Sequence, residues 1–353
     1  MLRIVWAAGM AALVAACPSA GSSDGLQPKP IPRVQAVPLP YDQVSFQRDG
    51  REIARYHFGP GLIRPFVYPI IGPSGHGLTR MGHPGDPDTH SHHNSVWLSL
   101  SDVNGVDFWL DRGGGRIRHR RIEHLEDADD FALVVSEADW VDGNGDVVMR
   151  ERRQTFAKLL PREEWMLVID IRLDAADEAA VIEPSSFGPI GVRLAKPISV
   201  HYGGGRIRNS EGFEGETAVF RKPARWVDYS GQSATGIIEG LTLMDHPSNP
   251  RHPAPFHVRE DGWMGAMLAL HDPYTIQPGK PLRMRYAVYV HAGMPPLAHI
   301  DKAWRRFATE PLRPPFGPPK TARDCLHGGY RRYNMPRSFS SQQDCANFVK
   351  GAQ

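Results

Sequence analysis

Glycine and proline interrupt this chain so often that long helices are not expected. The 353 residues include 35 Gly and 32 Pro, and both residue types weaken or end a helix when they fall in its interior. Between these interruptions lie short runs of alternating or β-branched residues, which is the pattern of strands. The runs are Phe131 to Val135, Trp165 to Leu173, Val181 to Ile182, Ile237 to Met244, Met264 to Leu270 and Leu282 to His291.

The spacing of these runs indicates a single all-β domain. They continue from residue 44 to about residue 310 with no break in composition and no internal repeat, which favours a large antiparallel β-sandwich over a propeller. Asp142-Gly143-Asn144-Gly145 predicts a hairpin turn, because these residues accept the positive φ of tight turns. One C-terminal helix is expected at Leu297 to Thr309, where apolar residues are spaced to form one buried face.

The N-terminus has the pattern of an export signal. An apolar run from Ile4 to Ala16 is long enough for a signal peptide and too short to span a bilayer as a mature helix. Val14-Ala15-Ala16-Cys17 resembles a lipobox, in which Cys17 would carry the lipid. Cleavage after Pro18-Ser19-Ala20 is the alternative. We therefore expect residues 1–20 to be a targeting segment and the protein to be periplasmic, attached to the outer membrane as a lipoprotein, or secreted.

The segments on either side of the domain differ from it in composition. Residues 21–43 are polar and rich in Pro, which predicts an extended tether. The tail, residues 311–353, contains Cys325 and Cys345, and an even pair in an oxidising compartment predicts a disulfide. A net charge of +2 with no evident basic face argues against a nucleic-acid partner. Contact with a membrane is expected only through a lipid on Cys17.

Histidines are concentrated in the segment His83 to Trp97. His90, His92 and His93 fall within four positions, and in an extended chain His90 and His92 would share one face. Histidine exchanges a proton near neutral pH, so such a pair could act as an acid and a polar clamp, or bind a metal. The alternative interpretation is a polar loop with hydrogen-bonded histidines.

A second polar cluster extends from Asp245 to Arg259. Its four prolines fix φ and make the loop rigid, which is useful where side chains must be held in place. The alternative is a Pro-rich crossover whose polar residues face water. The residues that could converge on a ligand are Asp245, His246, Asn249, His257 and Arg259.

Two further segments place Trp beside carboxylates or amides. The first contains Asn104, Asp107 and Trp109, and the second contains Trp226. A sugar is recognised by such groups, because carboxylates and amides bind hydroxyls and an aromatic face packs on the apolar side of the ring. Trp beside Asp is also common in ordinary cores and turns.

Taken together, several motifs resemble the bacterial PmoA-like family of unknown function, which is often labelled "methane oxygenase PmoA". The resemblance covers about residues 45 to 310 and leaves out the tail after about Pro311. It implies a galactose-mutarotase-like supersandwich, a fold shared by many sugar-processing enzymes. The motifs are Pro65 to Pro69, Gly77 to Arg80, His90 to His93, Asp102 to Trp109, Gly191 to Arg193, Trp226 to Gly231 and Asp245 to Asn249.

These observations favour an exported carbohydrate-active enzyme of the glycoside hydrolase, lyase or epimerase type. General acid–base catalysis is expected, because no Ser or Cys nucleophile motif is evident. His92 or His257 would protonate a sugar oxygen, and Glu216 or Asp245 would take a proton. Glu216 lies in a Gly-flanked acidic turn that could equally be surface. The residues expected to bind substrate are His90, His93, Asn104, Asp107, Trp109, Arg193, Trp226, His246, Asn249 and Arg259.

Two alternatives belong to other classes. The first is a non-catalytic glycan-binding lipoprotein, which needs the aromatic and arginine side chains but no perturbed acids. The second follows the oxygenase label, with His90, His92 and His246 binding copper or iron, since imidazole suits those metals. The enzyme hypothesis needs no cofactor, and its partner is a saccharide or another small polar substrate. It requires that the two histidine-containing clusters face one pocket.

Overall fold

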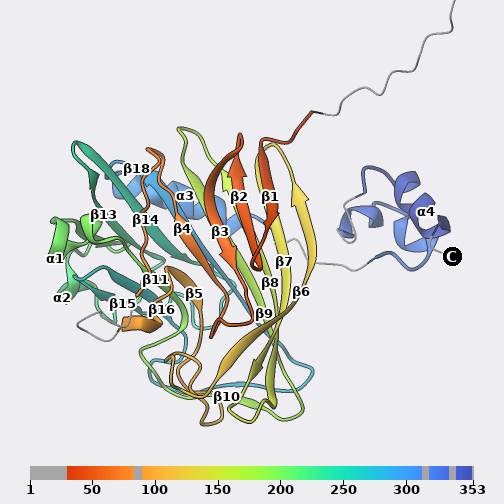
Figure 1. Cartoon of the computed structure of the whole chain (residues 1–353), viewed down its shortest axis with the longest axis horizontal. Coiled ribbons are helices and arrows are strands. Elements are labelled where there is room, and N and C mark those ends of the chain that lie inside the picture. Colours follow the sequence, from red (N-terminus) through yellow and green to blue (C-terminus); the bar gives the residue numbers. More distant parts are fainter. Residues whose placement is uncertain (1–29, 83–89, 312–317, 334–338, 352–353) are drawn as a thin grey trace, which may run out of the picture. The chain divides into compact units, whose positions relative to one another are not determined.

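The computed structural model describes residues 30–82, 90–311, 318–333 and 339–351. The expected targeting segment, Cys17 and residues 21–29 of the expected tether lie outside this range. The described chain forms two eight-stranded antiparallel sheets and a two-stranded ribbon (Figure 1). This confirms the all-β sandwich.

Sheet 1 combines the N-terminal strands with three strands from later in the chain. Its order is β1 (Val34–Leu39), β2 (Gln43–Arg48), β3 (Arg51–His57), β4 (Phe66–Ile70), β5 (Val96–Leu98), β11 (Pro189–Arg193), β16 (Trp263–Met267) and β15 (Phe256–Arg259).

Sheet 2 contains the longest strands of the molecule. Its order is β12 (Arg206–Asn209), β13 (Trp226–Ala234), β14 (Ile237–Asp245), β18 (Leu282–Ala292), β9 (Trp165–Ala175), β8 (Val147–Leu159), β7 (Phe131–Val141) and β6 (Arg116–Asp127). The ribbon pairs β10 (Ala180–Ile182) with β17 (Tyr274–Ile276).

The main core lies between the two sheets. In sheet 1, Val96 and Leu98 of β5 point into this core. Because side chains alternate along a strand, Trp97 between them faces the outer side of sheet 1. The same alternation in β15 sends Phe256 and Val258 inward and turns His257 outward. Sheet 1 therefore presents aromatic and imidazole side chains on its outer face.

Helix α3 (Leu297–Thr309) packs on the outer face of sheet 2. Ile300 and Phe307 are buried against a second apolar cluster that includes Trp226 and Tyr289. The Trp304 indole donates to the backbone oxygen of Asp245 at 2.9 Å. The helix expected from the sequence is confirmed at both ends.

The sandwich begins earlier than the sequence suggested. β1 lies inside residues 21–43, for which we expected an extended tether, and Val34 and Ala36 of this strand are buried. Pro38 obscured the strand pattern, but an edge strand can contain a proline, because one side of its backbone has no partner strand.

The expected tail contains three short helices. These are η3 (Ala322–Cys325), η4 (Gly329–Arg332) and α4 (Gln342–Gly351). A disulfide joins Cys325 to Cys345, as predicted. Among the helices of the described residues, none has the length and apolar character needed to cross a membrane.

Candidate functional site

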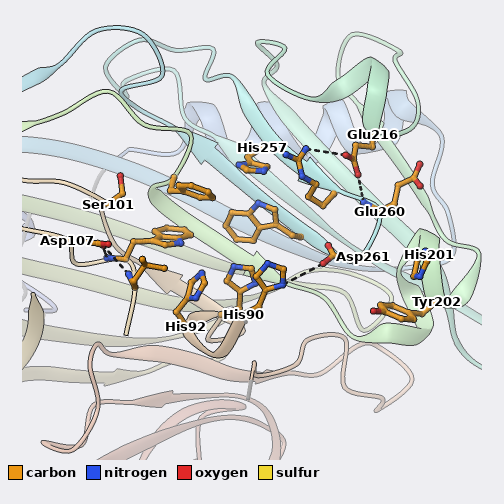
Figure 2. Close-up of a pocket in the computed structure, with 16 residues that line it drawn as sticks. His90, His92, Ser101, Asp107, His201, Tyr202, Glu216, His257, Glu260 and Asp261 are labelled. Atoms are coloured by element: carbon orange, nitrogen blue, oxygen red, sulfur yellow. Dashed lines mark hydrogen bonds and ion pairs between the residues drawn. The ribbon is translucent and has the colours of Figure 1, made fainter. Parts of the chain in front are cut away.

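A cavity of about 790 Å³ opens on the outer face of sheet 1 (Figure 2). Its walls come from β15, β16 and the loops around them. It is lined by His90, His92, His93, Ser101, Asp107, Trp109, Leu110, Phe187, His201, Tyr202, Glu216, His257, Arg259, Glu260, Asp261 and Trp263.

Trp109 and Trp263 form the floor of this cavity, and Trp97 packs beneath them. The rings of Trp97 and Trp263 lie 5.3 Å apart, and Trp109 packs against both. Gly191 of β11 lies between them in the sheet, and a β-carbon there would come within 2.7 Å of both the Trp97 and Trp263 rings. The absence of a side chain at Gly191 therefore allows the floor to close.

The three clustered histidines line the cavity together. The chain here is not extended: His90–His92 form the short 3-10 helix η1, and the His93 backbone N–H donates to the His90 oxygen at 3.0 Å. The turn stacks the rings of His90 and His93 at 4.5 Å, with His92 edge-on to both. In an extended chain His93 would point away from His90 and His92, whereas this turn brings all three rings into one cluster. Residues 83–89 of this motif lie outside the described residues.

Arg64 joins two segments that line the cavity, one at residues 92–94 and one at residues 108–109, by hydrogen bonds. One guanidinium nitrogen donates to the His92 oxygen at 3.1 Å and to Asn94 Oδ1 at 2.7 Å. Another donates to the Phe108 and Trp109 oxygens at 3.1 and 2.7 Å. Burial lowers the pKa of Arg64 to about 10, so the side chain stays charged at neutral pH. The sequence contained no pattern that marked this arginine.

Burial keeps the central imidazoles uncharged. It lowers the pKa of His92 to about 4, and the nearby Arg64 acts in the same direction. It lowers the pKa of His93 still further. Because both rings are neutral at pH 7, they can accept a hydrogen bond from a ligand, and burial disfavours the protonated form of each. The role of His92 as a proton donor stays a prediction.

His257 has a defined tautomer. Its Nδ1 lies 3.1 Å from the Ser186 carbonyl oxygen, which can only accept, so Nδ1 carries the hydrogen. Nε2 then holds a lone pair. Burial, with a contribution from the charge of Arg259, lowers the pKa of His257 to about 4. The ring is packed between Phe187 and Phe220, with centroid distances of 5.3 and 5.1 Å. It is thus a fixed neutral base.

Glu216 is held in place by its neighbours. It begins the short helix α2 (Glu216–Val219) and accepts from Arg259 Nη1 at 3.2 Å and from the Glu260 backbone N–H at 2.7 Å. Figure 2 shows both contacts. Because one contact falls on each carboxylate oxygen, Glu216 is better placed to anchor the 259–260 turn than to act as a free base.

Asp261 links a buried arginine to the imidazole cluster. Two nitrogens of Arg193 each lie 2.9 Å from an oxygen of this carboxylate. Arg193 is completely buried under the cavity. Asp261 Oδ2 is also 3.9 Å from His90 Nδ1, an ion pair when the ring is protonated. Arg193, predicted to bind substrate, therefore acts through Asp261 and does not line the cavity itself.

Asp107 and Trp109 line the cavity as expected, but Asn104 does not. Asp107 Oδ1 accepts from the backbone N–H groups of Trp109 and Leu110 at 2.6 and 3.1 Å, which fixes that turn. The Asn104 amide instead joins β10 to the 102–106 turn by accepting from the Val181 backbone.

The second cluster divides between the two sheets of the sandwich. β14 of sheet 2 ends at Asp245, and β15 of sheet 1 starts at Phe256, so the Pro-rich loop carries the chain from one sheet to the other. His257 and Arg259 reach the cavity, whereas Asp245, His246 and Asn249 lie at the end of sheet 2 near α3.

The residues on the α3 side have structural partners. Asp245 accepts from Asn249 Nδ2 at 2.7 Å and from the Ala254 backbone at 2.9 Å, and it pairs with His252. The ring of His246 lies edge-on to Phe307 at 5.1 Å. The predicted roles of Asp245, His246 and Asn249 at the ligand are not supported by this placement.

Trp226 is also a structural residue. It is buried in the cluster beneath α3, and its indole donates to Asp301 Oδ1 at 2.8 Å. It cannot stack on a ligand in the cavity.

The alternative metal set is divided by the same crossover. His90 and His92 line the cavity, and His246 lies under α3. Within the described ranges, no group of three or more His, Cys, Asp or Glu side chains is arranged to hold a metal ion.

Sequence reasoning missed several cavity residues. Asp261-Gly262-Trp263 repeats the Asp-near-Trp pattern singled out at residues 107–109 and could have been found by it. No comparable signal distinguishes the others, which come from loops that only the fold brings together. They are Ser101, Leu110, Phe187, His201, Tyr202 and Glu260.

The sequence matches the DUF6807 family, described as a family of unknown function, over residues 43–305. The chain belongs to this family. The DUF6807 match includes every residue that lines the cavity, from His90 to Trp263.

Solved structures with related folds are distant from this DUF6807 chain. A heparinase III gene product has 11% identity and a TM-score of 0.35, with 75% of this chain and 36% of the other covered. The DUF6807 chain thus spans about a third of its length. Galactose 1-epimerase from Lactobacillus acidophilus NCFM has 10% identity and a TM-score of 0.35, with 72% and 99% covered. Similarity at this level carries no argument about activity.

Among curated proteins, none matches the sequence. The DUF6807 description names no reaction, and neither it nor the two structures above carries the methane oxygenase label that the motifs resembled.

Proposed function

We propose that this protein is a carbohydrate-active enzyme that uses imidazoles as its acid and base. The observation that carries the proposal is His257, whose Nδ1 hydrogen is held by the Ser186 carbonyl so that Nε2 is left as a neutral base in the wall of the cavity. A base of this kind takes a proton from a hydroxyl or carbon of a bound substrate.

The acid is assigned to His90. Asp261, held by buried Arg193, lies 3.9 Å from His90 Nδ1, where it forms an ion pair with the ring whenever the ring carries a proton. Figure 2 shows His90 beside Asp261, with His257 across the cavity. His257 then accepts a proton on one side of the substrate while His90 returns one on the other, so the protein gains no net proton.

A saccharide is the substrate class that suits the lining. The cavity combines aromatic faces, supplied by Trp109, Trp263 and Phe187, with imidazole and carboxylate groups. Aromatic faces pack on the C–H side of sugar rings, and the polar groups bind hydroxyls. His257 faces His90 and its partner Asp261 across the cavity (Figure 2). Most glycoside hydrolases use two carboxylates, so this arrangement suits a lyase or an epimerase better than a hydrolase.

His257→Asn tests the proposal. The asparagine amide can still donate to Ser186, but the base at Nε2 is gone. We expect turnover of a saccharide found by screening to fall at least about a hundredfold. The melting temperature should change little. His271→Asn is the matched control, because His271 is outside the cavity and exposed.

The pH profile gives a second readout of the same proposal. The pKa of His257 is about 4, and the base must be unprotonated, so kcat/KM should hold as the pH falls to about 5 and decline below about 4.

Full turnover by His257→Asn would contradict the proposal. Saccharide binding without turnover in the native protein would favour the glycan-binding alternative.

We also propose that the protein is exported, on the basis of residues 1–20 of the sequence. Mass spectrometry of the N-terminus from the native host separates the two routes. A lipid-modified Cys17 supports anchoring, cleavage after Ala20 supports secretion, and an intact Met1 in the cytosol contradicts both.

A further inference from the structure

The cavity is long, and the proposed acid and base lie in its middle. Asp107 is at one end and Tyr202 is at the other, as Figure 2 shows, with the imidazoles of His90 and His257 between them. A substrate that reaches the central groups therefore has room on both sides of them.

The volume is too large for one sugar. A hexose has about twelve non-hydrogen atoms, and because bonded atoms each take less than the roughly 30 Å³ share of a water molecule in the liquid, it fills less than about 360 Å³. The cavity holds about 790 Å³. This leaves space for at least a second ring.

Two exposed aromatic rings line the cavity on either side of His257: Phe187 lies between His257 and Trp109, and Tyr202 lies at the far end (Figure 2). Phe187 is 40% exposed and lies 5.5 Å from the Trp109 ring, and Tyr202 is 45% exposed. Large aromatic side chains on a cavity rim leave apolar surface in water unless a ligand covers it. The two rings extend the apolar lining beyond the central floor.

Tyr202 is held firmly although it is exposed. It lies in the short helix α1 (Val200–Gly203), and Ser199 Oγ accepts from its backbone N–H at 3.2 Å. His201 N–H donates to the Glu260 oxygen at 2.9 Å, which ties α1 to the cavity wall. Lys196 Nζ lies 4.9 Å from the centre of the Tyr202 ring. A ring on a fixed backbone loses less freedom when a sugar stacks on it than a ring on a mobile loop does.

We propose that the substrate is an oligosaccharide of at least two units, with Tyr202 and Phe187 as stacking platforms on the two sides of the central imidazoles. This inference rests on the proposed function, because it names the substrate class of the same site.

A glycan array of mono-, di-, tri- and tetrasaccharides, followed by calorimetric titration with the series that binds, tests the inference. Affinity should rise about tenfold or more from one unit to three, as further rings cover apolar surface. Tyr202→Ala should weaken binding of the trisaccharide about tenfold and of the monosaccharide much less. Tyr202→Trp should restore most of the loss.

Phe213→Ala is the matched control. Phe213 is 47% exposed but lies outside the cavity, so its loss should not change affinity for any member of the series. Equal affinity for the monosaccharide and its oligomers, or an equal loss for both in Tyr202→Ala, overturns the inference and leaves the proposed function in place. Binding of no saccharide by the folded native protein overturns both.

Discussion

Gly191 shows how closely the cavity floor depends on single positions. Trp97 and Trp263 approach each other over this residue, and neighbouring strands β5 and β16 bring their rings to it from both sides. The sequence motif Gly-Val-Arg at residues 191–193 thus has two structural uses. Its glycine leaves room for the floor, and its arginine holds Asp261.

Gly191→Ala should destabilise the protein by about 1–3 kcal/mol, because the added methyl group meets two rigid rings that must move. Urea unfolding measures the change, and saccharide affinity should fall with it. Gly77→Ala is the control, since a β-carbon there meets nothing within 4 Å. A stability of Gly191→Ala equal to that of the native protein would show that the floor is loosely packed.

For single residues, the sequence predicted which side chains could react more reliably than which of them lie in the cavity. The histidines at 90–93 and His257 were recognisable as reactive types, and the fold brings them to one cavity. Asp245 was equally plausible from its composition. It lies at the end of sheet 2, away from the cavity, because the chain changes sheets between β14 and β15, and nothing in the local sequence marks that change.

Elements differ in how clearly the sequence reveals them. β9, β14 and β18 are central strands of sheet 2 whose apolar runs made them recognisable. β6 was missed, because it is an edge strand rich in Arg, and two register shifts interrupt its alternation. The amphipathic spacing of α3 was recognisable since a helix repeats its buried face over several turns.

Removal of the Phe307 ring tests the contribution of α3. Phe307→Ala should reduce the free energy of unfolding by about 3–5 kcal/mol, because the ring is buried between the helix and sheet 2. Arg305→Ala, at an exposed position of the same helix, should change it by less than about 0.5 kcal/mol. Both values come from urea unfolding. Equal effects of the two variants would mean that α3 is not packed on the sheet.

Across the whole molecule, buried histidines make the folded state less stable at low pH. Burial lowers the pKa of four of them to about 4, from an ordinary value of 6.5. Between these two values the unfolded chain binds more protons than the folded one, so stability falls as the pH falls. The four are His92, His119, His246 and His257.

The melting temperature should therefore be level above about pH 6.5 and fall by several degrees between pH 6.5 and pH 5. Differential scanning calorimetry at constant ionic strength measures it. His246→Asn, which removes one of these groups away from the cavity, should make the slope shallower. A melting temperature that does not change down to pH 5 would argue that these rings are hydrated in solution.

The cavity and α3 occupy opposite outer faces of the sandwich. Lys302 projects from the exposed side of this helix. A dye or a solid support coupled at that position would leave the mouth of the cavity open to solution, so the molecule can be mounted in one orientation for ligand screening.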